Sequence, residues 1–300
     1  MESAKQHPKG VLKRALKIYS NNDPLRLAGA TAFFTMFALP AVLFLILLVL
    51  RLVLSPKESS DELFSKLARY VGRDAANHLF NVLKNFEKIA TNPWATIGGV
   101  LFLLFVATTL FKVIKNSLND LWDIKVVEKM SVRLVASTRS RELAIIVAAG
   151  VLLLVSLFLD GMQMAAGDKL VDAKSFLSTF FSDVVSFMVS TIIVTCWFGL
   201  IFCFLPDARV PLRIGFSGAL LTSLLFNVGK FALTYLLFNS NLNQVFGASA
   251  AVVLLLLFVF YSSLIFYFGA AFTKSLAIEK NAELKPLSYA SHYVVKASKN

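Results

Sequence analysis

Residues 248–272 read ASAAVVLLLLFVFYSSLIFYFGAAF, a run of 25 residues without one charged side chain. A helix needs about 20 apolar residues to cross the hydrocarbon core of a bilayer, which is about 30 Å thick. The run is too long for a β-strand, and it lacks the alternation that is typical of membrane barrels. It therefore predicts a transmembrane helix and decides the fold class.

Five further runs are long and apolar enough to span a membrane. Of the 300 residues, 57% are hydrophobic and 16% are charged, whereas a soluble domain has about 45 to 50% and about 25%. The sequence predicts an all-α protein with one membrane domain over residues 27–272, a basic amphipathic leader over 1–26 and a tail over 273–300. The six predicted spans are 27–53, 94–118, 143–164, 184–205, 214–238 and 248–272.

The distribution of lysine and arginine predicts the orientation of the bundle. Six lie in the N-terminal segment, seven in the 112–142 connection, two in the 206–213 turn and five in the tail. Loops rich in these residues stay in the cytoplasm, so both termini are predicted to be cytoplasmic. Because topology accounts for the net charge of +12, nucleic acid is not needed as a partner. Membrane lipids are the predicted partners, with anionic headgroups at the basic side.

Two segments outside the spans show helical periodicity. Residues 11–19 mix apolar and basic side chains, as in a helix lying in the inner membrane interface; a solvated basic leader is the alternative. Residues 60–90 predict an external helical hairpin, broken near Gly72, that rests on the membrane or on the bundle. The polar tail, which contains Pro286, is expected to be partly disordered.

Lys230 is the most informative single residue, because an ammonium group within a span is costly and by default marks function. Asn227 shares its helix face, and Asp160 is the acid within the predicted spans. These three residues predict an outward-facing polar cavity with an Asp160–Lys230 pair. The alternative is that Lys230 extends its flexible stem to the outer headgroups.

Other features of the spans have both a packing and a functional interpretation. Pro40 lies within the first span, where proline can kink a helix. Clusters of small residues favour close helix packing. The hydroxyls of span four line a polar path or bond to their own carbonyls, and Trp94 and Trp122 are expected to be interface anchors. The stripe in span four comprises Ser186, Ser190, Thr191 and Thr195.

Signatures of enzymes are missing from the sequence. His7, His78 and His292 are scattered, and both cysteines, Cys196 and Cys203, lie in one apolar run. No phosphate-binding glycine loop or nucleophile elbow is present. The sequence therefore predicts no catalytic residue, no metal site, no cofactor and no enzymatic activity.

Four stretches of the chain resemble the YihY/virulence factor BrkB family of bacterial inner-membrane proteins, which was historically mislabelled as ribonuclease BN. The resemblance covers most of the chain in the right order. The stretches are AGATAFFTMFALP (28–40), KNSLNDLWDI (115–124), LPDARVPLRIGFSGAL (205–220) and FGASAAVVLLLLFVFYSSLIFYFGA (246–270).

The chain departs from the family pattern at several positions. Phe33 and Phe34 replace a tyrosine pair, Leu212 and Phe258 stand at usual tryptophans, and Ala271 stands where the family often has glutamate. If that carboxylate has a coupling role in relatives, this chain lacks it.

The resemblance implies six spans, an inner-membrane location and an undefined role in the cell envelope. The leading hypothesis is a transporter or flippase-like protein for an amphipathic or lipid-linked envelope molecule. The alternative is a structural scaffold without transport. Ribonuclease activity is not expected, because the ligands for metal-assisted cleavage are missing. Substrate, direction, energy source and oligomeric state leave no local motif.

Overall fold

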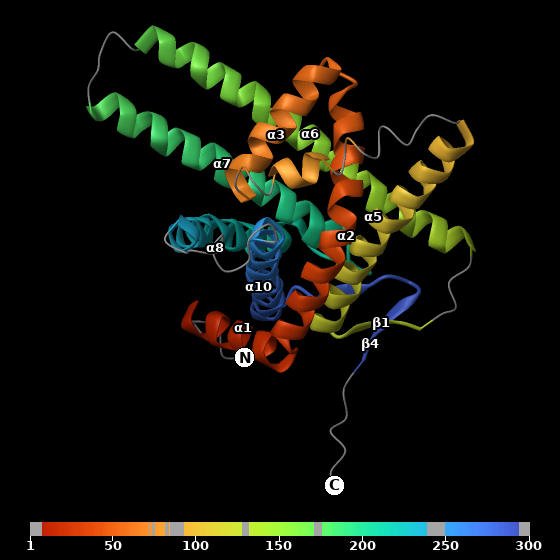
Figure 1. Ribbon diagram of the computed structural model, residues 1–300. Coiled ribbons are helices and arrows are strands. Elements are labelled where there is room, and N and C mark those ends of the chain that lie inside the picture. Colours follow the sequence, from red (N-terminus) through yellow and green to blue (C-terminus); the bar gives the residue numbers. More distant parts are fainter. Residues whose placement is uncertain are drawn as a thin grey trace.

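The computed structural model describes residues 8–71, 73, 76–81, 84, 93–127, 132–170, 176–238 and 250–293. The described chain is mostly helical, and each predicted span falls on a long helix (Figure 1). These helices are α2 (Pro24–Leu50), α5 (Pro93–Leu121), α6 (Val132–Leu170), α7 (Phe176–Phe204), α8 (Leu212–Phe238) and α10 (Ala250–Glu279).

Four of these helices are long and apolar enough, over described residues, to cross a membrane by length and composition. The qualifying segments are Pro24–Leu47 in α2, Phe187–Phe204 in α7, Leu212–Lys230 in α8 and Val252–Glu279 in α10. Helix α2 continues through Pro40 without a break. The predicted kink at this proline stays a prediction.

The segments that carry most of the basic residues meet at one end of the bundle, which we call the basic end. Helix α1 (Pro8–Asn21) packs against α10 there, and its N-terminal part is held by a hydrogen bond from Ser275 Oγ to the carbonyl of Val11, at 2.7 Å. The helix spans the predicted segment 11–19, so the helical prediction is confirmed.

The chain after α2 forms helix α3 (Pro56–Val71), in the first half of the predicted 60–90 hairpin. In the second half, residues 76–81 are helical, and the rings of Phe64 and Phe80 meet edge to face with centroids 5.3 Å apart. Leu63 is buried, and Lys66 Nζ donates a hydrogen bond to Ser156 Oγ of α6, at 2.7 Å. Helix α3 therefore rests on the bundle. The predicted break at Gly72 lies outside the described residues.

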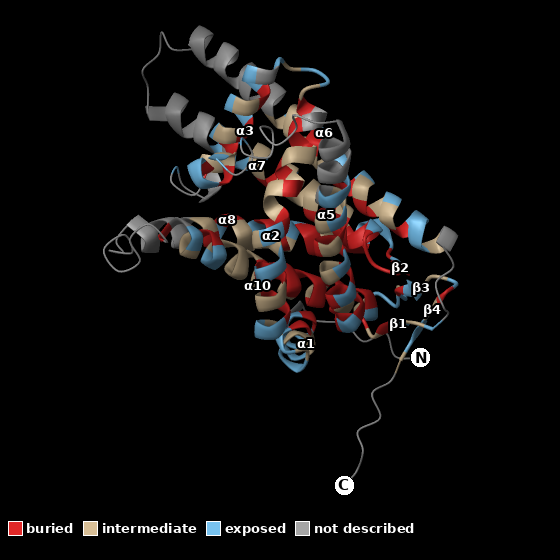
Figure 2. Ribbon diagram, turned by 45° about the vertical axis from the view of Figure 1, so that its right-hand side comes forward, coloured by how far each residue is buried: buried red, intermediate tan, exposed pale blue. Residues whose placement is uncertain are grey.

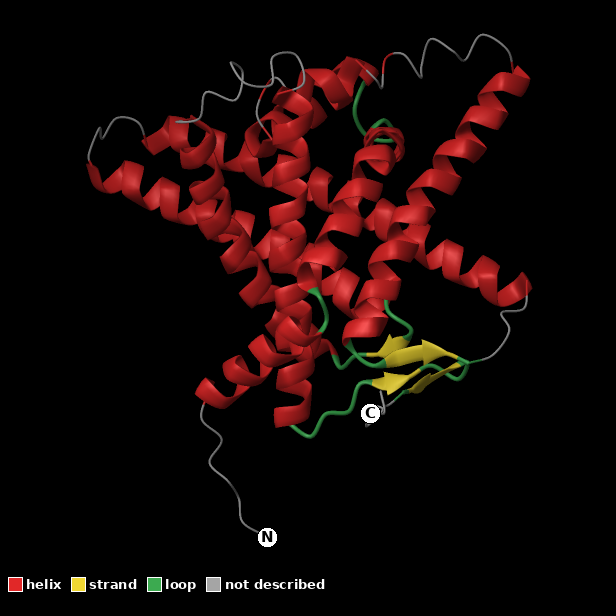
Figure 3. Ribbon diagram, turned by 60° about the horizontal axis from the view of Figure 1, so that its bottom comes forward, coloured by secondary structure: helices red, strands yellow, loops and turns green. Residues whose placement is uncertain are grey.

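Two small antiparallel sheets join the tail to two connections at the basic end (Figure 3). Strand β1 (Ile124–Val126) pairs with β4 (Ala290–His292), and β2 (Ala208–Arg209) pairs with β3 (Lys285–Pro286). The tail is ordered through residue 293, because its backbone groups pair with the two connections. The expectation of partial disorder stays a prediction for residues 294–300, which lie outside the described residues. The purely helical class needs a small correction for these strands.

Many residues near the basic end are buried, and Figure 2 shows buried residues there as well as along the middle of the bundle. Trp122, which follows α5, is 1% exposed, and its indole Nε1 donates a hydrogen bond to the carbonyl of Ala270, at 3.0 Å. The prediction of an interface anchor at Trp122 is therefore wrong. An amphipathic ring satisfies its polar group equally well at a membrane interface or on a buried carbonyl.

Helices α8 and α10 approach closely through reciprocal glycine–threonine pairs. A Cβ atom on Gly269 would collide with the hydroxyl of Thr222, and one on Gly218 would collide with that of Thr273. Each threonine hydroxyl also donates to the carbonyl of the glycine four residues earlier in its own helix, at 2.7 and 2.8 Å. Small residues allow such approach between membrane helices, so the packing interpretation of the glycines holds here.

Replacing Gly269 by Ala is expected to destabilise the protein by about 1 to 3 kcal/mol, the usual cost of overpacking. Gly29 in α2 is the matched control, because nothing lies within 4 Å of a Cβ placed there, and Gly29→Ala should be neutral or stabilising by up to about 1 kcal/mol. Thermal unfolding in detergent measures both. Equal stability of the two variants would contradict the close contact.

Candidate functional site: a buried charge cluster at the basic end

The side chains of only two of the three residues predicted to line a polar cavity are described. Asn227 is buried in α8 and donates from Nδ2 to Thr191 Oγ1 of α7, at 3.0 Å. Lys230 is half-buried on α8, and the side chain of Asp160 lies outside the described part of the chain. The Asp160–Lys230 pair therefore stays a prediction.

The two threonines of the stripe in span four bond to their own helix. Thr191 and Thr195 of α7 donate to the carbonyls four residues earlier, at 2.8 and 2.7 Å. Thr195 also contacts the hydroxyl of Ser223 on α8, at 2.7 Å. Together with the bond from Asn227, these contacts connect α7 to α8. The side chain of Ser186 lies outside the described part.

A different group of polar side chains is buried at the basic end, and we call it the charge cluster. At its centre is Lys115 of α5, whose Nζ lies 4.0 Å from Glu142 Oε1 of α6 and 3.8 Å from Asp207 Oδ2. The side chains of these three residues are 4%, 2% and 1% exposed. The remaining members are Asn119, Arg139, Arg141 and Tyr289.

Asp207, in the turn after α7, makes the most contacts in the charge cluster. Its Oδ2 accepts a hydrogen bond from Asn119 Nδ2 at 2.8 Å, and its backbone N–H donates to Asn119 Oδ1 at 3.0 Å. Its Oδ1 accepts from Tyr289 Oη at 2.9 Å and lies 3.3 Å from Arg141 Nη2. The carboxylate is thus fully engaged, as a buried charge requires.

The tail takes part in this cluster directly. The backbone N–H of Leu287 donates to the carbonyl of Asp207, at 3.0 Å, while the hydroxyl of Tyr289 binds its carboxylate. Strands β3 and β4 pair on either side of these contacts. The tail therefore fastens the turn after α7 to the end of α5.

The charges nearly balance within the cluster. Glu142 and Asp207 contribute −2, and Lys115, Arg139 and Arg141 contribute +3, so the net charge is +1 with Tyr289 neutral. Ion pairs of this kind contribute little net stability, but removing one partner is strongly destabilising. The cluster joins α5, α6, the turn after α7 and the tail, and the loss of one charge should destabilise this arrangement.

Sequence reasoning missed this cluster, although a signal existed. Lys115 and Asn119 are four residues apart and share one face of α5. Glu142 and Asp207 are acids within strongly basic connections. Lys115 and Arg141 were used only to predict the orientation of the bundle. Nothing in the local sequence shows that distant residues meet, such as Asn119 and Asp207, which are 88 positions apart.

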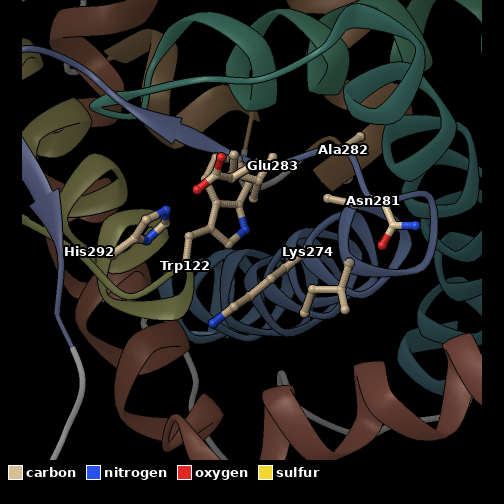
Figure 4. Close-up of a pocket in the computed structure, with 9 residues that line it drawn as sticks. Trp122, Lys274, Asn281, Ala282, Glu283 and His292 are labelled. Carbon is tan, nitrogen blue, oxygen red and sulfur yellow. The ribbon is translucent and has the colours of Figure 1, made fainter.

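A pocket of about 370 Å³ lies beside the cluster, between the end of α10 and the tail. Figure 4 shows Trp122 within it, with Lys274, Asn281 and His292 around the ring. Lys274 Nζ is already bound to Asp123 Oδ2, at 2.7 Å, and to the carbonyl of Leu121, at 2.9 Å. The pocket is mostly apolar and its lysine is paired, so the charge cluster is the stronger candidate site.

Tyr289→Phe is expected to cost about 1.5 to 3 kcal/mol, the range for hydrogen bonds to a charged group. Burial, followed by the adjacent Asp207 carboxylate, raises the pKa of Tyr289 to about 12. The folded protein therefore holds this proton more tightly than the unfolded chain, whose tyrosine pKa is about 10. The difference in the free energy of unfolding between the original protein and Tyr289→Phe should be largest below about pH 10. It should shrink as the pH rises toward about 12. Thermal unfolding against pH measures this, and a constant difference would contradict it.

The long apolar helices define a multi-pass helical membrane protein whose connections and tail are joined at one end. The sequence model of the family described as virulence factor BrkB matches residues 15–292, and the chain belongs to this family. Similar proteins include UPF0761 membrane proteins of Alcanivorax borkumensis, 28% identical over 84% of this chain and 56% of the relative, and of Idiomarina loihiensis, 29% identical over 73% of each.

A third relative, the UPF0761 membrane protein of Saccharophagus degradans, is 26% identical over 74% of this chain and 48% of its own length. The chain thus spans about half the length of the relatives from Alcanivorax borkumensis and Saccharophagus degradans. No solved structure matches the chain.

Proposed function

We propose that the chain is a six-span protein of the bacterial inner membrane that moves an amphipathic or lipid-linked envelope molecule, and that the charge cluster closes its cytoplasmic end. In this proposal α5 and α6 cross the membrane together with the four helices named above. The basic end faces the cytoplasm, where loops rich in lysine and arginine remain.

The order of the helices supports six crossings. Segments 112–142, 206–213 and the tail lie at the basic end, joined by the two small sheets. They follow α5, α7 and α10, and α1 precedes α2 at the same end. Successive long helices must then run in alternate directions, as six crossings with both termini on one side require.

The observation that carries the proposal is the change in packing along α5 and α7. At the basic end of these two helices Leu118, Leu121 and Phe202 are buried, whereas farther along them Phe102, Phe105 and Met188 are 58%, 62% and 58% exposed. Helix α2 differs, because its far end stays packed and Leu47 and Leu50 are buried there. Figure 3 shows the helices close together above the two sheets and farther apart toward the opposite end. A protein closed on one side of the membrane and open to the other has this form.

The exposed side chains in the outer half face lipid or a substrate path, and both suit an amphipathic molecule. The charge cluster would act as a gate, because its ion pairs hold α5, α6 and the turn after α7 together. A scaffold that only organises partners has no need for a closure that can open. The two hypotheses therefore differ in whether the basic end changes shape.

Lipid movement in proteoliposomes tests the proposal. The experiment uses Arg209→Cys with Lys285→Cys, an exposed pair directly opposite in β2 and β3, in a background with Cys196→Ala and Cys203→Ala. Anionic, zwitterionic and polyprenyl-linked lipids carrying a fluorophore are bleached from outside by dithionite. A bismaleimide joins the two cysteines, because dithionite would reduce a disulfide between them. We expect the protein without the crosslink to move at least one of these lipids faster than protein-free vesicles, and the crosslinked protein to be slow. No movement above that of protein-free vesicles for any of these lipids would contradict transport and favour the scaffold.

A further inference from the structure

We infer that one side of α1 lies in the inner leaflet, where this helix binds the headgroups of anionic phospholipids. The inference concerns a surface separate from the charge cluster and does not depend on transport. Helix α10 covers only part of the apolar side of α1.

The contacts of α1 with α10 fix its rotation. Val11 and Ala15 are buried, and Tyr19 meets Phe268 edge to face with ring centroids 5.7 Å apart. On the other flank, Arg14 Nη1 pairs with Glu279 Oε2 at 3.2 Å. Because both flanks are held, the remaining side chains point in defined directions.

The apolar side of α1 extends beyond what α10 covers. Leu12 and Leu16 lie one turn apart, beside the buried residues, and are 45% and 51% exposed. Lys13 and Lys17, next to each leucine in the sequence, are exposed as well. Leucines flanked by lysines on a helix with one apolar side are typical of a helix in the membrane interface.

The position of α1 places these leucines beside the start of a segment able to span the membrane. Two residues, Asn22 and Asp23, separate α1 from Pro24, the first residue of a segment able to span the membrane. Asp23 has a positive φ of 48°, which turns the chain sharply. Leu25, in the first turn of α2, is 67% exposed and extends the apolar surface toward the lipid. Helix α1 is therefore held within the depth of the headgroups.

Charge favours an anionic leaflet over a second copy of this chain. The chain carries a net charge of +12, so two copies repel each other. A basic side chain near an anionic membrane surface gains a free energy equivalent to about a fivefold change in equilibrium constant. Lys13 and Lys17 together should therefore favour binding to anionic headgroups over neutral ones by more than tenfold.

The test uses the full chain in nanodiscs of phosphatidylcholine, with and without phosphatidylglycerol, in the background with Cys196→Ala and Cys203→Ala. An environment-sensitive fluorophore is placed at Leu16→Cys or, as control, at Asn21→Cys. Asn21 is exposed and lies about 140° around the helix from Leu16. We expect the label at 16 to be shifted to the blue and shielded from acrylamide, a neutral quencher that phosphatidylglycerol does not repel. The shielding should be greater with phosphatidylglycerol, and the label at 21 should remain solvated. Lys13→Gln with Lys17→Gln should remove the dependence on phosphatidylglycerol.

Three outcomes would overturn the inference. Equal quenching at 16 and 21 would show that α1 lies in water. Shielding at 16 without any dependence on phosphatidylglycerol would exclude recognition of anionic headgroups. Shielding that depends on the number of chains per nanodisc would show that a second copy covers the leucines.

Discussion

Replacing Asp207 by Ala is expected to lower the free energy of unfolding by about 3 to 5 kcal/mol, the cost of leaving buried charges without their partner. Asp207 is 0% exposed, and its carboxylate contacts Lys115, Arg141, Asn119 and Tyr289. Without it Lys115 keeps only Glu142, at 4.0 Å, and the tail loses the acceptor for Tyr289. Thermal and denaturant unfolding in detergent measure the loss.

Asp61→Ala is the matched control, because Asp61 is exposed on α3, and it should change stability by less than about 0.5 kcal/mol. Lys115→Met combined with Asp207→Ala should cost less than the sum of the two single changes, since the residues share one network. Additive losses, or an Asp207→Ala protein as stable as the control, would contradict the cluster.

Trp122→Ala is expected to cost about 3 to 5 kcal/mol, as for other large buried aromatic residues. The ring is 1% exposed, and its N–H binds the carbonyl of Ala270 on α10. Trp122→Phe separates the two contributions, because it keeps most of the apolar contact and loses only the hydrogen bond. We expect it to cost about 1 kcal/mol of that total.

Trp197→Phe is the control for Trp122, because Trp197 is half-buried on α7 and should change stability little. Intrinsic fluorescence offers a second measurement, since Trp122 should be shielded from aqueous quenchers. A quenched, solvent-like Trp122 with a small cost of Trp122→Ala would restore the interpretation as an interface anchor.

The apolar runs were sufficient to predict the long helices, because the length and composition of a span are local properties. The run at 248–272 became the core of α10, and the mixed segment at 11–19 became α1. Successive spans place alternate connections on the same side, and this rule also placed α1, the 112–142 connection and the tail at one end. Each of these predictions rests on residues that are neighbours in sequence.

The charge cluster could not be predicted in the same way, because it depends on contacts between distant residues. Lys115 lies in the last turn of the predicted span 94–118 and looks like any lysine at the end of a span, yet its ammonium group lies between Glu142 and Asp207. Trp122 at the end of a span has the same local context as an interface anchor. The strands of the tail could not be predicted because they are too short to form alone, and they are stabilised by pairing with β1 and β2.

Distances across the basic end test the central claim, that the charge cluster is a gate, most directly. Spin labels at Lys112→Cys of α5 and Arg209→Cys of β2, both exposed, in the background with Cys196→Ala and Cys203→Ala, report this distance in lipid nanodiscs. We predict two distance populations, with the longer one growing when Asp207→Asn removes the charge. A single narrow population that Asp207→Asn leaves unchanged would contradict the gate and favour a rigid scaffold.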